Sequence, residues 1–398
     1  MKRKVALIPF LAFLMLLRIC VSVDFKLVLN LVYKTDHGGV YSLAAFDNRL
    51  FAGTGVHDDQ AKIFVYDGVN WSLDFQVEET HIWNLVEYDG KLYASTMDKY
   101  VAEPEPHTVQ AGAIYVYDPI ADEWRVAYNM DYGVVGLGVY NGKLYAGVSF
   151  DGLIYVYDGV SWKVAYDVDP SHIVCFSVYD GKLYAGTEFY GAVYVYDGVF
   201  WKETWRPPAS PNGVECLAVY DGKLYVGTSS QDPEHPEGTL YVFDGTEWNV
   251  ALETSSYAVW RLTIYDDMLF ATTWDPAFIY VLNDSGWEAV CDLDDYIPVH
   301  IDSFAVYNDT LYAGTAVPGW IYATQLRIYM ETDLNKDGKV NIQDLFIVAK
   351  AFGSHGPDIP NPGDLASEKW NPVADVTKDG WVNIRDLYEV AKDYGKTL

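Results

Sequence analysis

The sequence predicts a chain of repeated four-stranded sheets, followed by a small helical domain at the C-terminal end. One phrase, Leu then Tyr or Phe then a mostly small pair, recurs seven times at spacings of 39–52 residues. Asp-Gly and Asn-Gly pairs, which favour two-residue hairpin turns, precede several copies. The 398 residues include 33 Tyr, 17 Phe and 13 Trp, and aromatic residues favour strands. A repeat of this length is typical of propellers and solenoids.

The seven copies set the number of sheets. They begin at Leu50, Leu92, Leu144, Leu183, Leu224, Leu269 and Leu311. A Tyr-rich strand and then a strand that opens on Trp follow most copies, which gives four strands per repeat. The last copy lacks the Trp strand, and residues 25–29 match that strand in the third copy. We therefore expect an all-β seven-bladed β-propeller whose N-terminal strand completes the last blade and removes its open edge.

The repeat also resembles a known family. The stretch Ala113–Pro119, followed by Trp124, is similar to the kelch repeat, although Ala-Gly, Ala-Ser or Ala-Thr stands where kelch repeats have Gly-Gly. The resemblance covers about 300 residues and implies a kelch-like propeller. It implies no activity, because propellers host many functions.

The charge excludes some partners. The chain has 27 Lys and Arg against 56 Asp and Glu, a net charge of −29. A surface this acidic argues against nucleic acid and against anionic lipid, since both require basic patches. It is compatible with divalent cations as partners.

The N-terminus has the layout of a secretory signal peptide. Lys2, Arg3 and Lys4 precede 13 apolar residues, which are too few for a membrane-spanning helix. We predict a signal peptide over 1–23, a propeller over 24–328 and a calcium-binding domain over 329–398. The mature protein is then secreted, extracellular or at the cell surface, without a lipid membrane as partner.

Three cysteines remain after cleavage of the leader. Cys175 and Cys216 lie at equivalent places in adjacent repeats, and Cys291 lies further on. The equivalence is compatible with a disulfide between blades. We favour the alternative that these residues are small buried hydrophobic side chains.

Candidate ligand-binding residues share a place at the start of the predicted innermost strands. They are Tyr41, His81, Trp83, Asn84, His172, Glu215, Trp260, Arg261, His300 and Asp302. Aromatic rings beside carboxylates, an amide and a guanidinium suit a sugar or a peptide. The alternative is that Trp83 and Trp260 only fill gaps between blades. A three-histidine metal site is disfavoured, because repeat symmetry spreads the histidines around the ring.

Three classes of function remain open for the propeller. The first is a binding protein for carbohydrate or a protein ligand. The second is a polysaccharide-degrading glycoside hydrolase or lyase, for which Glu215 and Asp302 are catalytic candidates by position alone. The third is a purely structural cell-surface protein.

After residue 332 the sequence carries two 12-residue acidic loops, 42 residues apart. Oxygen side chains at loop positions 1, 3, 5, 9 and 12, a carbonyl at position 7 and Gly at position 6 suit Ca²⁺. The first predicted site consists of Asp333, Asn335, Asp337, Lys339, Asn341 and Asp344. The second consists of Asp375, Thr377, Asp379, Trp381, Asn383 and Asp386. A short amphipathic segment that ends at a glycine follows each loop.

Loop followed by helix, twice, with Asp rather than Glu at position 12, resembles the type I dockerin. The match covers about 65 residues, and the Pro-rich spacer 354–374 is longer than in most dockerins. The resemblance implies two Ca²⁺ sites of the EF-hand type and a cohesin-like partner bound through the helices. It also implies membership of an extracellular assembly, often one that functions in polysaccharide catabolism.

Overall fold

The computed structural model describes residues 24–398 apart from a set of short gaps. These gaps are residues 57–58, 99–110, 169–170, 189–190, 209–211, 231–236, 284–285, 294–299, 317, 330–333, 335–341, 356–365, 367–368, 370, 372–373, 378–379, 393 and 395–398. The predicted signal peptide therefore lies outside the described residues. The chain divides into two compact units, one spanning 27–325 and the other containing 326–398. The predicted domain boundaries at 23/24 and 328/329 stay predictions.

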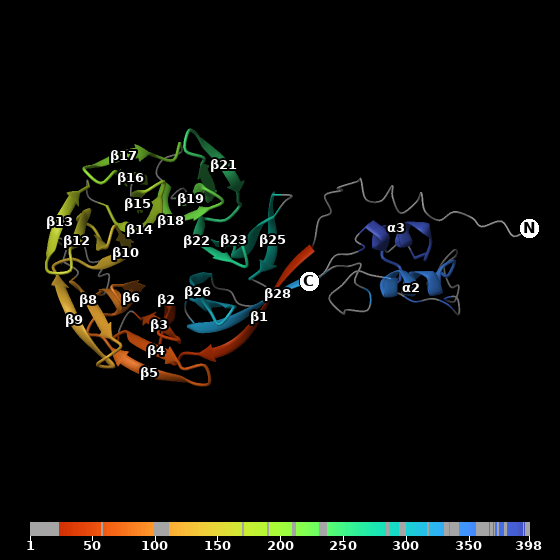
Figure 1. The fold of residues 1–398 in the computed structure, drawn as a ribbon, viewed down its shortest axis with the longest axis horizontal. Helices are drawn as coiled ribbons and strands as arrows, with labels where there is room; N and C mark the ends of the chain where they lie inside the picture. Colours follow the sequence, from red (N-terminus) through yellow and green to blue (C-terminus); the bar gives the residue numbers. More distant parts are fainter. Residues whose placement is uncertain are drawn as a thin grey trace, which may run out of the picture. The chain divides into compact units, whose positions relative to one another are not determined.

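Within the described residues, 28 strands form seven blades arranged as a ring (Figure 1). The innermost strands are β2 (Gly39–Phe46), β6 (His81–Tyr88), β10 (Val134–Tyr140), β14 (Ile173–Tyr179), β18 (Asn212–Tyr220), β22 (Ala258–Tyr265) and β26 (Ile301–Tyr307). The second strands are β3 (Arg49–Gly55), β7 (Lys91–Met97), β11 (Lys143–Val148), β15 (Lys182–Thr187), β19 (Lys223–Ser230), β23 (Met268–Trp274) and β27 (Thr310–Thr315). All are antiparallel within their blades.

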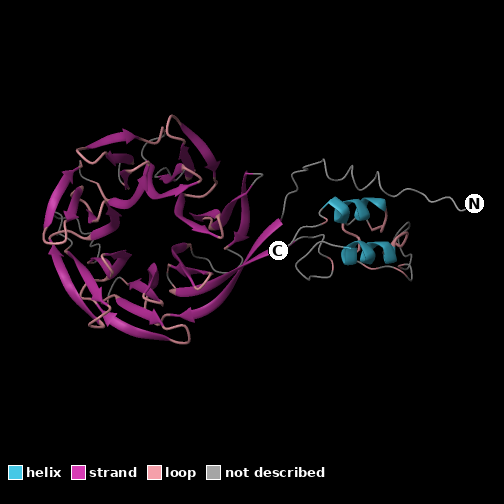
Figure 2. Cartoon of the chain, viewed as in Figure 1, coloured by secondary structure: helices cyan, strands magenta, loops and turns pink. Residues whose placement is uncertain are grey.

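The third strands are β4 (Lys62–Tyr66), β8 (Gly112–Asp118), β12 (Leu153–Tyr157), β16 (Ala192–Tyr196), β20 (Thr239–Phe243), β24 (Phe278–Asn283) and β28 (Trp320–Tyr329). The outermost strands are β5 (Trp71–Gln76), β9 (Glu123–Met130), β13 (Trp162–Asp167), β17 (Trp201–Trp205), β21 (Trp248–Glu253), β25 (Gly286–Asp292) and β1 (Asp24–Lys34). Figure 2 shows that the described residues of the ring are strands and loops. The prediction of an all-β seven-bladed propeller is confirmed.

The ring closes as the sequence predicts. The last sheet has the order β1-β28-β27-β26, so the N-terminal strand is the outer strand of the blade that the end of the propeller forms. Leu27 and Leu29 of β1 are buried. Closure pairs the free edge of β28 and removes a template for aggregation.

The hairpins between first and second strands adopt the predicted turn. Asp89 and Gly90 have φ of 50° and 68°, and Asp180 and Gly181 have φ of 47° and 68°. Both central residues of a type I′ turn require positive φ, which Asp, Asn and Gly tolerate best.

The small residue of the repeated phrase allows neighbouring blades to approach. A Cβ atom at Gly147 would lie 2.4 Å from the Ile173 carbonyl oxygen of the next blade, and one at Gly186 would lie 2.5 Å from Val214 Cγ1. Ile173 and Val214 are fully buried at these contacts. A β-branched side chain of one blade therefore packs against the backbone of its neighbour.

Tyrosines account for a second repeated contact between blades. The hydroxyl of Tyr140 donates a hydrogen bond of 2.7 Å to the carbonyl of Gly181, in the hairpin of the next blade. Equivalent bonds join Tyr88 to Gly142 and Tyr220 to Asp267. Part of the tyrosine excess is therefore structural.

The C-terminal unit contains the helices α2 (Ile342–Ala351) and α3 (Ile384–Lys392). Val348 and Val390, at equivalent positions of the two repeats, are fully buried in one cluster with Val382 and Ala374. The long spacer thus does not prevent the two helices from sharing a core. Gly353 follows α2 with φ of 79°, the conformation expected of a glycine at a helix end.

Candidate functional site

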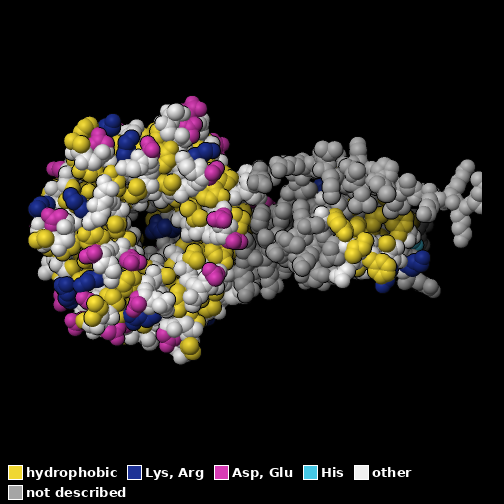
Figure 3. Space-filling view, in the orientation of Figure 1, with side chains coloured by type: hydrophobic (Ala, Val, Ile, Leu, Met, Phe, Trp, Pro, Cys, Tyr) yellow, Lys and Arg dark blue, Asp and Glu magenta, His cyan; other side chains and the backbone are white. Residues whose placement is uncertain are grey.

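The channel of the propeller contains a cavity of about 480 Å³. Side chains of all seven innermost strands line it. Figure 3 shows the hollow at the centre of the ring, with basic atoms in dark blue inside it. This volume lies within the roughly 300–1,000 Å³ typical of small-molecule sites.

One irregularity repeats in every innermost strand. Its pairing with the second strand shifts by one residue at the same place, so that one residue is left out of the ladder. These bulged residues are Tyr41, Trp83, Val135, Val174, Glu215, Trp260 and Asp302. All seven line the cavity. A β-bulge redirects a side chain, and here it directs one residue of each blade into the channel.

Asp302 is the most buried acid of this ring, with 1% of its surface exposed. Its Oδ1 accepts a hydrogen bond of 2.6 Å from Trp260 Nε1 and lies 3.1 Å from His300 Nε2. Its Oδ2 is buried and has no hydrogen-bond partner among the described residues. Since a buried acceptor without a donor costs about 1–3 kcal/mol, Oδ2 is a place where a ligand donor would stabilise the site.

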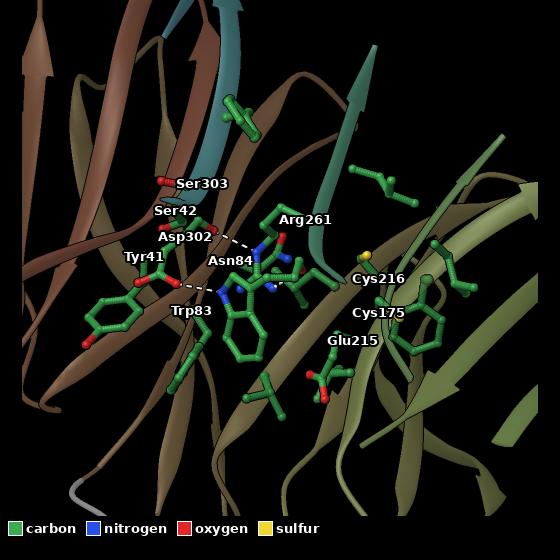
Figure 4. Close-up of a pocket in the computed structure, with 18 of the residues that line it drawn as sticks. Tyr41, Ser42, Trp83, Asn84, Cys175, Glu215, Cys216, Arg261, Asp302 and Ser303 are labelled. Carbon is green, nitrogen blue, oxygen red and sulfur yellow. Dashed lines mark hydrogen bonds between the residues drawn. The ribbon is translucent and has the colours of Figure 1, made fainter. Parts of the chain in front are cut away.

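Trp83 and Tyr41 form an aromatic wall beside Asp302. Their ring centroids lie 5.1 Å apart, and His81 stacks on Trp83 at 5.7 Å. Trp83 Nε1 is buried without a hydrogen-bond acceptor in the described part of the chain. Burial and the charge of Asp302 raise the pKa of Tyr41 to about 12, so its hydroxyl stays a donor. Figure 4 shows Tyr41, Trp83 and Asp302 on the same side of the cavity.

Glu215 lies on the wall that β18 contributes. Ser229 donates a hydrogen bond of 2.6 Å to its Oε1. Burial and repulsion from Glu188 raise the pKa of Glu215 to about 7, against the opposing effects of Ser229 and Arg261. Glu188 itself lies 3.0 Å from His172 Nδ1. Glu215 can therefore exchange a proton near neutral pH.

Arg261 directly follows the bulge of β22 and reaches into the cavity (Figure 4). Its Nε donates to the carbonyl of Asp302 at 2.7 Å, and its Nη1 donates to the carbonyl of Trp260 at 2.9 Å. The guanidinium also lies 4.8 Å from the centre of the Trp260 ring. These contacts fix the position of the cation.

The structure brings most of the predicted ligand-binding residues together. The cavity-lining members are Tyr41, Trp83, Asn84, His172, Glu215, Trp260, Arg261 and Asp302. His81 and His300 do not line the cavity. His81 stacks on Trp83, and His300 contacts Asp302. The roles of all ten residues, and the catalytic candidacy of Glu215 and Asp302, stay predictions.

Sequence reasoning missed two members of the bulged ring, Val135 and Val174. They occupy the same repeat position as Tyr41 and Trp83, so alignment of the repeats would have identified them. Their apolar character drew no attention. They line the cavity on β10 and β14, between Trp83 and Glu215 in blade order.

Among the described residues, Cys175, Cys216 and Cys291 form no disulfide. Burial raises the pKa of Cys216 to about 12 and the pKa of Cys175 well above its ordinary value. Both line the cavity, where they act as small apolar side chains. The favoured interpretation thus agrees with the structure, and the disulfide alternative does not.

Part of the second predicted calcium loop is described. Asp386 is fully buried, and its carboxylate accepts hydrogen bonds from the backbone N–H groups of Thr377 at 2.9 Å and Asn383 at 2.7 Å. Asp375 accepts a bond of 3.0 Å from the Gly380 N–H. The buried carboxylate of Asp386 and the half-buried carboxylate of Asp375, with Asn383 and the Trp381 carbonyl nearby in sequence, fit a hard cation such as Ca²⁺.

Most of the first predicted loop lies outside the described residues. This applies to Asp333, Asn335, Asp337, Lys339 and Asn341, and in the second loop to Asp379. Asp344 is described: it is fully buried and accepts a bond of 2.8 Å from the Leu334 N–H. Like Asp386 in the second repeat, it is fully buried and accepts a hydrogen bond from a backbone N–H of its own loop.

The propeller unit, residues 27–325, has the fold of solved propeller structures. One match is to a catalytically inactive virginiamycin B lyase from Staphylococcus aureus with quinupristin, at a TM-score of 0.56 and 12% identity over 76% of this chain and 100% of the other. Another is the extracellular domain of a one component system from B. thetaiotaomicron, at 0.58 and 18% over 74% of this chain and 39% of the other. At these identities the likeness shows the fold alone. No curated protein sequence matches the chain.

The C-terminal unit is identified more specifically. Residues 331–393 match the family model of the dockerin type I domain, so the chain carries a type I dockerin behind a β-propeller. Type I dockerins bind calcium, and they imply a cohesin partner and tethering in an extracellular cellulosome. Among the residues described, no helix is both long and apolar enough to cross a membrane.

Proposed function

We propose that this protein is a secreted carbohydrate-binding protein, whose propeller cavity holds a sugar and whose dockerin tethers it to a cohesin. The observation that carries the proposal is a pair of buried polar atoms, one donor and one acceptor, in two residues that line the cavity. Trp83 Nε1 is a donor without an acceptor and Asp302 Oδ2 is an acceptor without a donor, as far as the described residues extend. A ligand hydroxyl both donates and accepts, so sugar hydroxyls would satisfy both atoms.

The rest of the cavity supports a sugar over a protein segment. Tyr41, Trp83 and Trp260 offer aromatic faces for the apolar face of a sugar ring, next to the polar groups of Asn84 and Arg261. A cavity of about 480 Å³ suits a small ligand rather than a folded surface.

A second candidate function has one observation in its favour. Glu215 has a pKa of about 7 and lies in the same cavity as Asp302, so it can act as a general acid toward a glycosidic bond. Glu215 and Asp302 belong to blades separated by the blade of β22. This candidate is a glycoside hydrolase or lyase that uses the same ligand site.

We also propose that the dockerin binds two Ca²⁺ ions, one in each 12-residue loop, through the predicted ligands. The equivalent burial of Asp344 and Asp386 supports two similar sites. The apolar residues Ile342 and Phe346 of α2 and Ile384 and Tyr388 of α3 are 56–65% exposed, so they are available to the cohesin partner. The signal peptide over 1–23 provides the route to the extracellular space.

The proposal is tested by glycan-array and calorimetric binding with the calcium-loaded full chain. Binding of a glycan that Asp302→Asn or Trp83→Phe weakens at least tenfold supports it. The control Asp292→Asn, on an outer strand, should leave affinity unchanged. Release of product from the bound glycan, lost in Glu215→Gln, would establish the enzyme instead. If no glycan binds, the proposal is wrong.

A further inference from the structure

We propose that the sugar bound in the propeller cavity carries a carboxylate, and that Arg261 binds this group. The inference rests on the proposed carbohydrate function and adds the chemical class of the ligand. It comes from the surroundings of Arg261, whose contacts differ from those of Arg49 and Arg206.

Arg261 has no carboxylate partner among the residues that the structure describes. Its two hydrogen bonds go to the backbone carbonyls of Asp302 and Trp260. By contrast, Arg206 makes charge pairs with Glu203, and Arg49 pairs with Asp47 and Asp122. Arg125 also lacks an acidic partner in the described part of the chain, but it is exposed on the outermost strand β9, whereas Arg261 lines the cavity.

The guanidinium retains binding capacity toward the cavity. It has five N–H donors, and the two bonds to carbonyls use two of them. The Trp260 ring, 4.8 Å away, supports one face of the group and holds its plane. A planar fork held in this way matches a carboxylate, which can accept two parallel hydrogen bonds.

The acids of the cavity do not neutralise this cation by contact. Glu188 pairs with His172 at 3.0 Å, and Glu215 accepts from Ser229 at 2.6 Å. Asp302 directs Oδ1 to Trp260 and His300 rather than to the guanidinium. Arg261 is therefore available to an incoming anion, although the acids disfavour ligands with several negative charges.

The neighbouring groups favour an acidic sugar over a simple anion. Asp302 Oδ2 needs a donor and Trp83 Nε1 needs an acceptor, and a bare carboxylate cannot donate. A uronic acid provides hydroxyls for these two atoms and a carboxylate for Arg261 in one ring. The apolar bulged residues Val135 and Val174 complete the wall that faces a sugar's C–H groups.

The first test compares the binding of acidic, esterified and neutral oligosaccharides to the wild-type protein. Calcium-loaded full chain is titrated with oligosaccharides of galacturonate, glucuronate or mannuronate, each beside its methyl ester, and with neutral galactose and glucose oligomers. We expect at least one acid to bind, with its uncharged ester at least tenfold weaker. Because the ester keeps the ring and hydroxyls, this difference isolates the carboxylate.

Variants then assign the carboxylate to Arg261. Arg261→Gln should reduce affinity for the acid to that for the ester, and Arg261→Lys should be intermediate because it keeps the charge and loses the fork. Arg206→Gln, which removes an exposed arginine directly after β17, is the matched control and should bind like the wild type. Unchanged affinity for the ester in Arg261→Gln shows that the cavity remains folded.

Three results would overturn the inference. Equal affinity for acids and esters, or binding of neutral oligomers alone, removes the carboxylate and leaves the proposed function intact. A carboxylate effect that persists in Arg261→Gln assigns the group to another residue. No binding of any glycan removes both the inference and the proposed function.

Discussion

The buried acid Glu215 should make the stability of the propeller depend on pH. Burial and the nearby Glu188 raise its pKa from an ordinary value near 4.5 to about 7. Between these two values the unfolded chain has released the proton and the folded chain has kept it. Stability therefore falls as pH rises through this window and is constant with respect to this group above it.

The magnitude follows from the pKa difference. At 1.36 kcal/mol per pKa unit, the full effect on the free energy of unfolding is about 3 kcal/mol, and most of it falls between pH 5 and pH 8. Glu215→Gln removes the titration while its amide oxygen can still accept the bond from Ser229. We expect the stability of Glu215→Gln relative to wild type to rise by this amount from pH 5 to pH 8.

Guanidinium denaturation of the calcium-loaded chain, followed by tryptophan fluorescence, measures the difference at each pH. Glu188→Gln should reduce the effect, because it removes the repulsion that helps to raise the pKa of Glu215. Glu253→Gln, at an exposed position of β21, is the control and should show the same offset at both pH values. A pH-independent difference between Glu215→Gln and wild type would refute the reasoning.

Three further outcomes are expected. Deletion of residues 24–34 should leave β28 as an open edge and produce aggregation, which light scattering detects; a monomeric product as stable as the wild type would contradict ring closure by β1. Trp260→Phe should lower the free energy of unfolding by about 1–3 kcal/mol, because Asp302 Oδ1 loses a buried donor, and an unchanged denaturation midpoint would argue against that bond. Chelation of Ca²⁺ with EDTA, or Asp386→Ala, should reduce the helical circular dichroism of the dockerin and leave the β signal of the propeller; an unchanged helical signal would contradict calcium-dependent folding.

The propeller could be predicted because each blade requires particular residue types at its turns and at its contacts with the next blade. Hairpins such as Asp89-Gly90 need residues that tolerate positive φ, and the small residue at Gly147 is required where Ile173 approaches. Each requirement acts within a blade or between adjacent blades, so it leaves the same mark in every copy. Even the seventh blade, whose strands come from the two ends of the propeller, could be predicted from these repeated residues.

The site could be predicted only in part, for a physical reason. The bulge that directs Trp83 or Glu215 into the channel is a matter of register between two strands, and the amino acids at the bulge do not repeat. Chemically conspicuous residues were therefore found, whereas Val135 and Val174 were not. The unpartnered state of Trp83 Nε1 and Asp302 Oδ2 depends on distances between blades, which no single repeat contains.

This separation explains how one scaffold can carry a specific cavity. The residue before each bulge, such as Val40, Ile82 or Val214, is fully buried between blades and keeps its β-branched character. The bulged residue itself does not pair in the ladder, so its side chain is free of the constraint that repeats around the ring. Packing and recognition thus fall on adjacent residues of the same strand. A seven-bladed propeller can therefore present an asymmetric wall of aromatic, apolar and charged groups to its ligand without altering the contacts that hold the blades together.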